Sequence, residues 1–579
     1  MEETAAKLEL NHEQVNDVPV LIYLLEERLG IGRAMDKIVG RHGNRQGLSI
    51  GRVMTTWMTH ILSECNHFMS HVQEWANGLT MTLGAMHGQG IQAGDFGDAR
   101  LSEVVRVLSD DEVWHELERQ VTGNMIRAYN LKVERVRLDT TTASVYSEKE
   151  GAVLFQRGYS KDHRPDLRQL KVMVAALDPL GVVVGADVVS GDQADDGLYV
   201  PMIKRMQSSL MAQGLLYVGD CKMGALSTRS YIQQSKNFYL MPLANIGEVP
   251  EQLDKWVEDA LSGRAKTLTL TAGSDEADGS TPAQIIGQGY EITRRVHDDE
   301  SGTSWNERVM IVKSEAFAEA ARTGLTQRIQ RATAALLALT PTPSRGRRPI
   351  KDAPALEQAA SAVLKKYQVE GLLSWKITTL IETQSLRAYG DRPERTEQKQ
   401  RLQIDVQQND KAIQRATQHL GWRAYATNAP RRLLSLHEAV LAYHHEWLIE
   451  RDFARLKGRS LSLSPLWLKR EDHAIGMTRL LTLAVRLLAL AEHEARLNLK
   501  HDNQALPGLY PSRKNRLTPI PTTERLLRAF NRIVVSTIRI GNTVKLYLTP
   551  LSDLQHTIVA LFGCPADLYE RLTSNLVFA

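Results

Sequence analysis

Three carboxylates stand in this sequence where a catalytic metal site would need them. Asp139 falls in the strand-like run 133–146, Asp220 ends the apolar run "LLYVGD", and Glu450 lies in a helical segment. A carboxylate in an apolar strand costs free energy unless it is solvated, hydrogen-bonded or bound to a cation. Taken alone, Asp139 is more typical of a strand end that begins a turn, capped by the three threonines that follow it. The three acids together favour one hard-cation site with oxygen ligands.

The predicted chemistry is phosphoryl transfer with divalent metal ions. Mg²⁺ and Mn²⁺ accept carboxylate ligands and keep positions open for substrate oxygens. Two such ions about 4 Å apart activate a water or a 3′-hydroxyl and stabilise the leaving oxygen of an in-line displacement. We therefore predict that Asp139, Asp220 and Glu450 are the catalytic residues and also the ligands of a pair of Mg²⁺ (or Mn²⁺) ions in each active site.

The segment 435–457 has the apolar pattern of a long helix with a chemically unusual face. Tyr443, Glu446, Glu450 and Lys457 follow one another at i, i+3, i+7 and i+14. At about 100° per residue, these spacings place all four side chains on one face of a continuous helix. A solvated stripe with incidental charge would show the same pattern. Beside the metal site, Tyr443 and Lys457 are instead expected to bind phosphates of the substrate.

The elements between residues 131 and 240 explain how two distant aspartates could meet. The pattern predicts three strands, then a helix at about 195–214, then the short strand that ends at Asp220. The first three strands should form an antiparallel meander, and the helix should carry the chain across to the fourth. The first and fourth strands would then lie side by side, with Asp139 next to Asp220. A later helix would bring Glu450 to them.

Changes in composition along the chain divide it into five predicted regions. They are a helical N-terminal DNA-binding region (1–130), the first part of a catalytic core (131–240), an insertion of strands followed by helices (241–420), a second part of the core that carries Glu450 (421–500), and a C-terminal region for DNA binding or dimerisation (501–579).

The bulk composition is that of a soluble globular protein. A formal charge of +4, from 71 basic and 67 acidic residues, excludes a histone-like polycation but allows local basic patches. The polar N-terminus does not read as a signal peptide. The most apolar segment, "RLLTLAVRLLALAEHEAR", is interrupted by Arg486 and reads as too short to span a bilayer. We expect a cytoplasmic, nucleoid-associated protein.

Three blocks of the sequence resemble the DDE transposases of bacterial insertion sequences. "LDTTT" and "YVGDCKMG" resemble the first and second aspartate blocks of that family, and "YHHEWLIERDFARLK" resembles its C-terminal signature of tyrosine, arginine, glutamate and lysine. The signature's spacing is kept, but Glu446 stands where the family has arginine. Arg451 or Arg455 is therefore expected to supply the missing basic contact to DNA. "RGYSKDHRPDLRQ" and "GLYPSRKNRLTPIPTTERLLRAF" resemble a branch of the family with long transposases.

This resemblance implies an α/β fold with a ribonuclease-H-like mixed sheet core. It also implies a helical N-terminal domain and a β-rich insertion between the fourth and fifth core strands. The implied enzyme is a cut-and-paste DNA transposase, which binds the terminal inverted repeats of its element, cleaves the ends by metal-dependent hydrolysis and joins the 3′-hydroxyls to target DNA. Because two ends must be held together, a homodimer or larger homo-oligomer is expected.

Two other functions fit the same sequence. One is a catalytically inactive, transposase-like regulator that binds DNA, against which the retention of all three carboxylates argues. The other is a ribonuclease-H-fold nuclease without strand transfer, which the sequence does not separate from a transposase.

Overall fold

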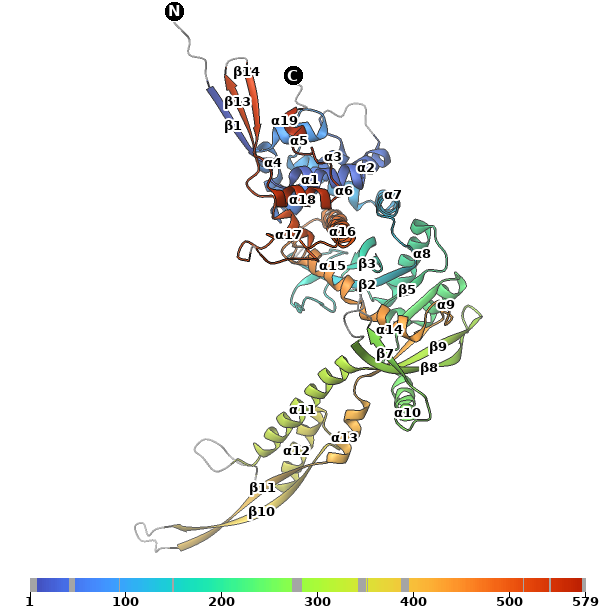
Figure 1. The fold of residues 1–579 in the computed structure, drawn as a ribbon. Helices are drawn as coiled ribbons and strands as arrows, with labels where there is room; N and C mark the ends of the chain where they lie inside the picture. The colour runs from blue at the N-terminus through green and yellow to red at the C-terminus, as the bar shows by residue number, and fades with distance from the viewer. Residues whose placement is uncertain are drawn as a thin grey trace, which may run out of the picture. The chain divides into compact units, whose positions relative to one another are not determined.

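The computed structural model describes residues 8–40, 47–92, 94–147, 150–272, 284–341, 350, 352–386, 395–513, 515–540 and 543–574. The chain forms two compact units (Figure 1). The first comprises Met1–Met241, Val296–Trp305 and Ala442–Ala579, and the second comprises Pro242–Arg295 and Asn306–Leu441. Most of the predicted insertion, 241–420, falls in the second unit, apart from Met241 and Val296–Trp305, and the predicted carboxylates all belong to the first.

Consecutive strands of a larger mixed sheet form the centre of the first unit, in the order β4-β3-β2-β5-β6. Its strands are β2 (Arg135–Val145), β3 (Arg168–Leu177), β4 (Val182–Ser190), β5 (Leu216–Val218) and β6 (Phe238–Pro242). The first three pair antiparallel, whereas β5 runs parallel to both β2 and β6. The predicted neighbourhood of the first and fourth strands is therefore confirmed, and α8 (Tyr199–Leu210) makes the crossover between β4 and β5.

The position of the insertion differs from the prediction. The fifth strand of the sheet is β6, which precedes the second unit, so the insertion follows the fifth strand and does not separate it from the fourth. The five residues of β6, "FYLMP", are too few to show a strand period in the sequence. They form a strand because they pair in parallel with β5. The strand β12 (Trp422–Thr427), which we expected in the core, pairs antiparallel with β9 (Thr303–Ser314).

Helices from both ends of the chain complete the first unit. The N-terminal helices are α1 (Val18–Tyr23), α2 (Ile31–Val39), α3 (Ile50–Glu64), α4 (Met69–Asn77), α5 (Thr80–His87), α6 (Asp98–Ser109) and α7 (Asp111–Tyr129). The C-terminal part adds α15 (Trp447–Lys457), α16 (Glu471–His501), α17 (Thr523–Leu527), α18 (Asp553–Leu561) and α19 (Arg571–Ser574). Figure 1 shows the N-terminal helices in blue beside the C-terminal helices in red.

The two ends of the chain also share a small sheet. Strand β1 (Leu8–Gln14) pairs antiparallel with β13 (Val534–Ile540), which pairs in turn with β14 (Thr543–Leu548). The N-terminal and C-terminal regions, which we treated as separate, therefore belong to one compact unit.

Helix α16 is the central helix of the first unit. It is long and apolar enough to cross a membrane, contrary to our expectation from the shorter quoted run, but 94% of its most apolar window is buried inside the protein. It packs against α6 and β4. Its most deeply buried cation, Arg486, forms an ion pair with Glu118 of α7, so the charge that interrupts the apolar run is neutralised inside the core.

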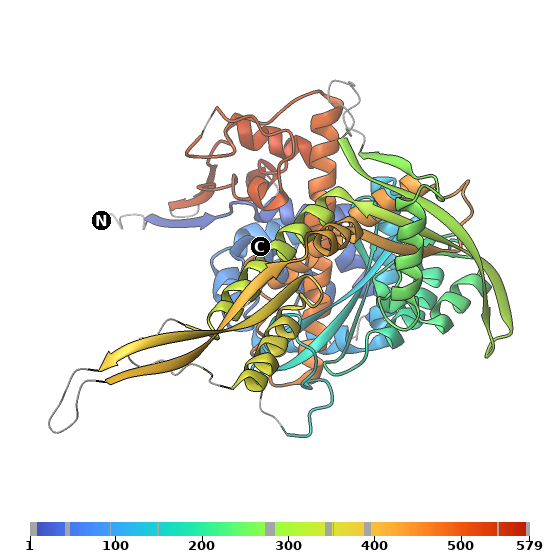
Figure 2. The ribbon, with the colours of Figure 1, turned by 90° about the horizontal axis from the view of Figure 1, so that it is seen from below.

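The second unit alternates helices and strands, whereas we predicted strands followed by helices for the insertion. It holds β7 (Leu268–Ala272), most of β8 (Gln284–Asp298) and of β9, β12, and the helices α10 (Val249–Leu261), α11 (Glu315–Leu337), α12 (Ala353–Tyr367) and α13 (Asp410–His419). A long hairpin of β10 (Leu373–Leu386) and β11 (Arg395–Gln408), drawn in yellow to orange in Figure 2, packs on α11 and α12 through an apolar core that includes Leu336, Leu356 and Ile404.

Candidate active site

Asp139 and Asp220 lie at matching positions on two adjacent parallel strands. In the register of β2 and β5, Arg137 lies opposite Val218, and each aspartate comes two residues later along its own strand direction. Asp139 is inside β2, where its side chain keeps 23% of its surface exposed. Asp220 follows β5 and caps a short 3₁₀ helix, Cys221–Gly224. The pairing of β2 with β5 thus brings together two acids that are 81 residues apart (220 − 139).

Asp220 is held by two hydrogen bonds to one of its oxygens. Its Oδ1 accepts from the Tyr199 hydroxyl at 2.6 Å and from the Lys222 backbone N–H at 2.8 Å. Tyr199 is buried at the start of α8, the crossover helix. The helix that connects the two halves of the sheet therefore also orients the second carboxylate.

The electrostatic environment of Asp139 favours a cation. The pKa of Asp139 is raised to about 6, mainly by burial and also by the negative charges of Asp220 and Glu446, against the opposing effects of the Lys161 ammonium and the Thr140 backbone N–H. A carboxylate surrounded in this way is stabilised when positive charge is brought to it. Asp220 lies near Asp139 because β2 and β5 are adjacent, and the charge of Glu446 acts on Asp139 as well.

A loop that follows β2 supplies that positive charge. Lys161 Nζ lies 3.5 Å from Asp139 Oδ1 and donates a hydrogen bond to Thr140 Oγ1 at 2.9 Å. It also donates to the backbone carbonyl of Thr140. The Lys161 backbone N–H donates to Thr142 Oγ1 at 2.9 Å. The threonines that follow Asp139 therefore fix this loop.

The next residue, Asp162, connects the same loop to α15. Its Oδ1 accepts from Lys457 Nζ at 2.6 Å, and its Oδ2 accepts from Ser464 Oγ at 2.6 Å and from the Ser144 backbone N–H at 3.2 Å. Burial raises the pKa of Asp162, but the hydrogen bonds from Lys457 and Ser464 outweigh it and hold the pKa below its ordinary value. Lys457, which we predicted to bind DNA phosphate, is thus ion-paired inside the protein.

The predicted helix 435–457 is interrupted, which changes the positions of its acids. Helix α14 (Leu436–His444) ends before His445 and Glu446, and α15 begins at Trp447. The backbone N–H of Glu446 donates to the Tyr443 carbonyl, three residues back, in place of an α-helical bond. Tyr443 therefore belongs to a different helix from Glu450 and Lys457, whereas Glu446 lies in the turn between the two helices and is the N-cap of α15. The side chain of Glu450 is exposed on α15, and Glu446 is the acid that acts on Asp139.

The two arginines that we predicted to contact DNA have partners within the protein. Arg451 donates to Glu492 of α16 at 2.7 Å and to the Leu180 carbonyl at 3.0 Å. Arg455 is buried and forms ion pairs with Glu492 and with Glu524, the latter at 2.9 Å. Buried pairs of this kind fasten α15 to α16 and α17. The predicted DNA contacts of these arginines stay predictions.

The donor chemistry of the site suits a hard divalent cation. Asp139 and Asp220 offer carboxylate oxygens, and the Lys161 ammonium already lies against Asp139. Throughout the part of the chain that the structure describes, no group of three His, Cys, Asp or Glu residues is close enough to form a ready-made metal site. Residues Asp139, Asp220 and a glutamate of the α14–α15 segment fit Mg²⁺ or Mn²⁺ by ligand type; bringing the glutamate to the aspartates requires a movement of its side chain.

The sequence interpretation missed three residues of this site. Lys161 and Asp162 belong to the block "RGYSKDHRPDLRQ", which we noted as a resemblance without assigning a role to its members. Nothing in the sequence indicated a functional role for Tyr199, because a tyrosine in a half-apolar helix is typical of a core residue. Their roles depend on which side chains the sheet brings together.

Comparison with known proteins places the chain in a family. The family model described as "Transposase DDE domain" matches residues 134–487, more than half of the 579 residues. No curated protein matches. Among solved structures, the chain is similar to a piggyBac transposase in a synaptic complex with hairpin DNA, at 9% identity and a TM-score of 0.37, over 88% of this chain and 79% of that one. That similarity is too low to support an argument. The match to the family model, which spans Asp139, Asp220 and Glu450, shows that this chain belongs to the DDE transposase family.

Proposed function

We propose that this protein is a cut-and-paste transposase of a bacterial insertion sequence, with a ribonuclease-H-like core. It would bind the terminal inverted repeats, hydrolyse a phosphodiester at each end and join the freed 3′-hydroxyls to target DNA. The observation that supports this best is the placement of Asp139 and Asp220 at matching positions on adjacent parallel strands, close enough for one carboxylate to raise the pKa of the other. The strand order, with β5 and β6 parallel to β2, is the one we expect of a ribonuclease-H-like sheet.

We assign the third carboxylate to Glu450, and the direction of α15 supports this assignment. Lys457 lies at Thr142 of β2, and the chain beyond it reaches the end of β2, where Leu466 pairs with Val145. Before α15, the Ala442 carbonyl accepts a hydrogen bond from Arg137, which precedes Thr142 in β2, so α15 follows β2 in the same direction. Glu450 precedes Lys457 by about 10 Å of helix, and Asp139 precedes Thr142 by about 10 Å of strand. Glu450 is thus expected beside Asp139, with Glu446 as the competing candidate.

Each described residue then has a definite task. Asp139 and Asp220 would hold the cations, and Tyr199 and the Lys222 N–H keep Asp220 in one orientation. Bound Mg²⁺ or Mn²⁺, two per site in this proposal, would supply activation of the attacking oxygen and stabilisation of the leaving oxygen. The pair formed by Asp162 and Lys457 holds α15 against β2. Tyr443 of α14 and Arg451 and Arg455 of α15 are proposed to contact DNA.

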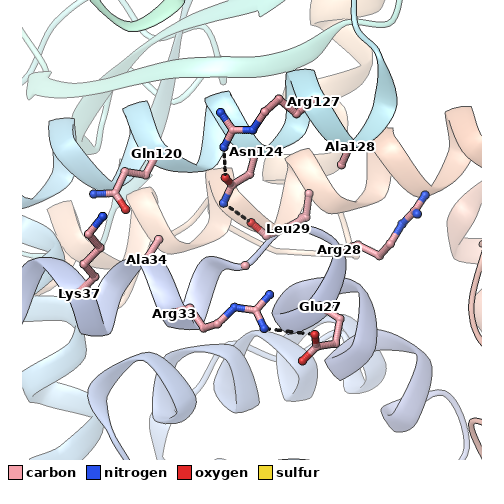
Figure 3. Close-up of a pocket in the computed structure, with 11 residues that line it drawn as sticks. Glu27, Arg28, Leu29, Arg33, Ala34, Lys37, Gln120, Asn124, Arg127 and Ala128 are labelled. Atoms are coloured by element: carbon pink, nitrogen blue, oxygen red, sulfur yellow. Dashed lines mark hydrogen bonds and ion pairs between the residues drawn. The ribbon is translucent and has the colours of Figure 1, made fainter.

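The N-terminal helices offer a basic surface for the DNA ends. A hollow between α2 and α7 is lined by Arg28, Arg33, Lys37 and Arg127, against one acid, Glu27 (Figure 3). Arg33 pairs with Glu27 at 3.1 Å, and Arg127 donates to Asn124 at 2.7 Å. Cations gathered in a hollow are typical of contacts to phosphates. This surface supports DNA binding by residues 1–130.

The assay for this function uses the DNA that flanks the gene. The purified protein and a supercoiled plasmid that carries both flanks would be incubated with Mg²⁺, and excised ends and joined products would be mapped by sequencing. Cleavage at inverted repeats followed by joining is the expected result. Cleavage without joining would identify a nuclease, and specific binding without cleavage would identify a regulator.

A further inference from the structure

The Lys161 ammonium occupies a position beside Asp139 where a metal ion would also have to lie. It is 3.5 Å from Asp139 Oδ1 and is held there by Thr140, through its hydroxyl at 2.9 Å and its carbonyl. A ligand oxygen binds Mg²⁺ at about 2.0–2.1 Å. A divalent ion at that distance and the Lys161 ammonium at 3.5 Å would both lie against the Asp139 carboxylate. The two positive charges would therefore repel each other strongly.

Only the side chain of Lys161 is able to leave without disturbing the loop. The Lys161 backbone N–H is bound to Thr142, and Asp162 is bound to Lys457, Ser464 and Ser144. The loop is therefore fixed on both β2 and α15. A lysine carries its charge on a flexible four-carbon stem, and the side chain of Lys161 keeps 31% of its surface exposed. The ammonium is thus free to exchange Asp139 for another anion nearby.

We propose that Lys161 is a positioning residue that competes with divalent metal for Asp139 until a DNA phosphate draws its ammonium away. The inference rests on the proposed function, because it takes a DNA phosphate as the second anion. Binding of DNA then favours binding of metal, and, since coupling is reciprocal, metal favours DNA. This competition restricts metal binding at Asp139, and with it hydrolysis, to the protein–DNA complex.

The test measures Mn²⁺ affinity by the loss of the free-ion EPR signal, with and without a DNA duplex that carries the element's end. Without DNA, Lys161→Gln is expected to bind Mn²⁺ about tenfold more tightly than wild type, within the usual range of coupling. The duplex should tighten Mn²⁺ binding to wild type about tenfold and to Lys161→Gln by twofold or less. Lys161→Arg, which keeps the charge, should behave as wild type.

Lys222→Gln is the matched control, because it removes another lysine charge beside the site. The backbone of Lys222 contacts Asp220, and its side chain is exposed. If Lys161→Gln and Lys222→Gln raise the Mn²⁺ affinity equally, general electrostatics explains the change and the inference is overturned. An affinity of Lys161→Gln within twofold of wild type overturns it as well.

Two further variants keep the result interpretable. Lys161→Met retains the apolar stem and replaces Lys161→Gln if thermal unfolding shows that the glutamine variant does not fold. Asp139→Asn should lose most Mn²⁺ binding. If wild type and Asp139→Asn bind Mn²⁺ equally, the metal site of the proposed function fails and the inference fails with it. If only Asp139→Asn changes the affinity, the site stands and the role of Lys161 is refuted.

Discussion

Replacing Asp139 with asparagine should make the metal-free protein more stable at neutral pH. In the folded protein the pKa of Asp139 is about 6, against 3.8 for the ordinary side chain, mainly because of burial. This difference corresponds to about 3 kcal/mol of destabilisation when the group is charged. Asparagine keeps an acceptor for the Thr140 N–H but loses the attraction to Lys161, so we expect a net gain of about 1–3 kcal/mol.

The stability gained by Asp139→Asn should depend on pH. The folded-state pKa of Asp139 lies above its unfolded-state value, so the ionised carboxylate destabilises the folded protein. This destabilisation is complete above about pH 7 and shrinks as the pH falls through 6 toward 3.8. At pH 4.5 the expected cost is about 1 kcal/mol. The measurement is urea unfolding of wild type and Asp139→Asn in EDTA at pH 8 and pH 4.5.

Asp162→Asn is the matched control, because the pKa of Asp162 is shifted in the opposite direction from that of Asp139. The pKa of Asp162 is lowered, as the hydrogen bonds from Lys457 and Ser464 outweigh burial, so its carboxylate contributes stability above its unfolded-state pKa. Asp162→Asn should therefore be less stable than wild type at pH 8. If Asp139→Asn were also less stable than wild type at pH 8, burial would not be the dominant influence on Asp139, and the reasoning would be wrong.

Two other predictions concern DNA and the second aspartate. DNA affinity should fall steeply with salt, by roughly 10³-fold between 50 and 200 mM for about six phosphate contacts; a flat titration would point to a protein partner. Tyr199→Phe removes the 2.6 Å hydrogen bond to Asp220 and should slow DNA cleavage about 10- to 100-fold with unchanged DNA affinity; an unchanged cleavage rate would show that the Lys222 N–H alone orients Asp220.

The local pattern was enough to predict the first part of the core. Apolar strands around 133–146 and 215–220, with a meander and a helix between them, predicted that Asp139 and Asp220 could meet. The structure confirms that pairing through β2 and β5. The prediction succeeded because the connection rules for short strands leave few alternatives.

The sequence alone did not predict the features that depend on contacts between distant residues. The break between α14 and α15 leaves the apolar period intact, so the segment reads as one helix, and only the backbone bond from Glu446 to Tyr443 reveals the turn. The pairing of β1 with β13 joins residues more than 500 positions apart. Lys161 and Asp162 gain their partners from β2 and α15, which no spacing within their own loop indicates.

The identity of the third carboxylate tests the proposed active site most directly. Single-turnover cleavage of DNA that carries the element's end, with Mg²⁺ or Mn²⁺, should be measured for wild type, Glu450→Gln and Glu446→Gln after DNA binding is shown to be intact. We expect Glu450→Gln to lose at least about 10²–10³ in rate, the effect of one transition-state electrostatic contact, and Glu446→Gln to stay within about tenfold of wild type. If Glu450→Gln cleaves within twofold of wild type while Glu446→Gln is inactive, the acid that lies near Asp139 in the structure is the catalytic one, and our assignment of Glu450 is wrong.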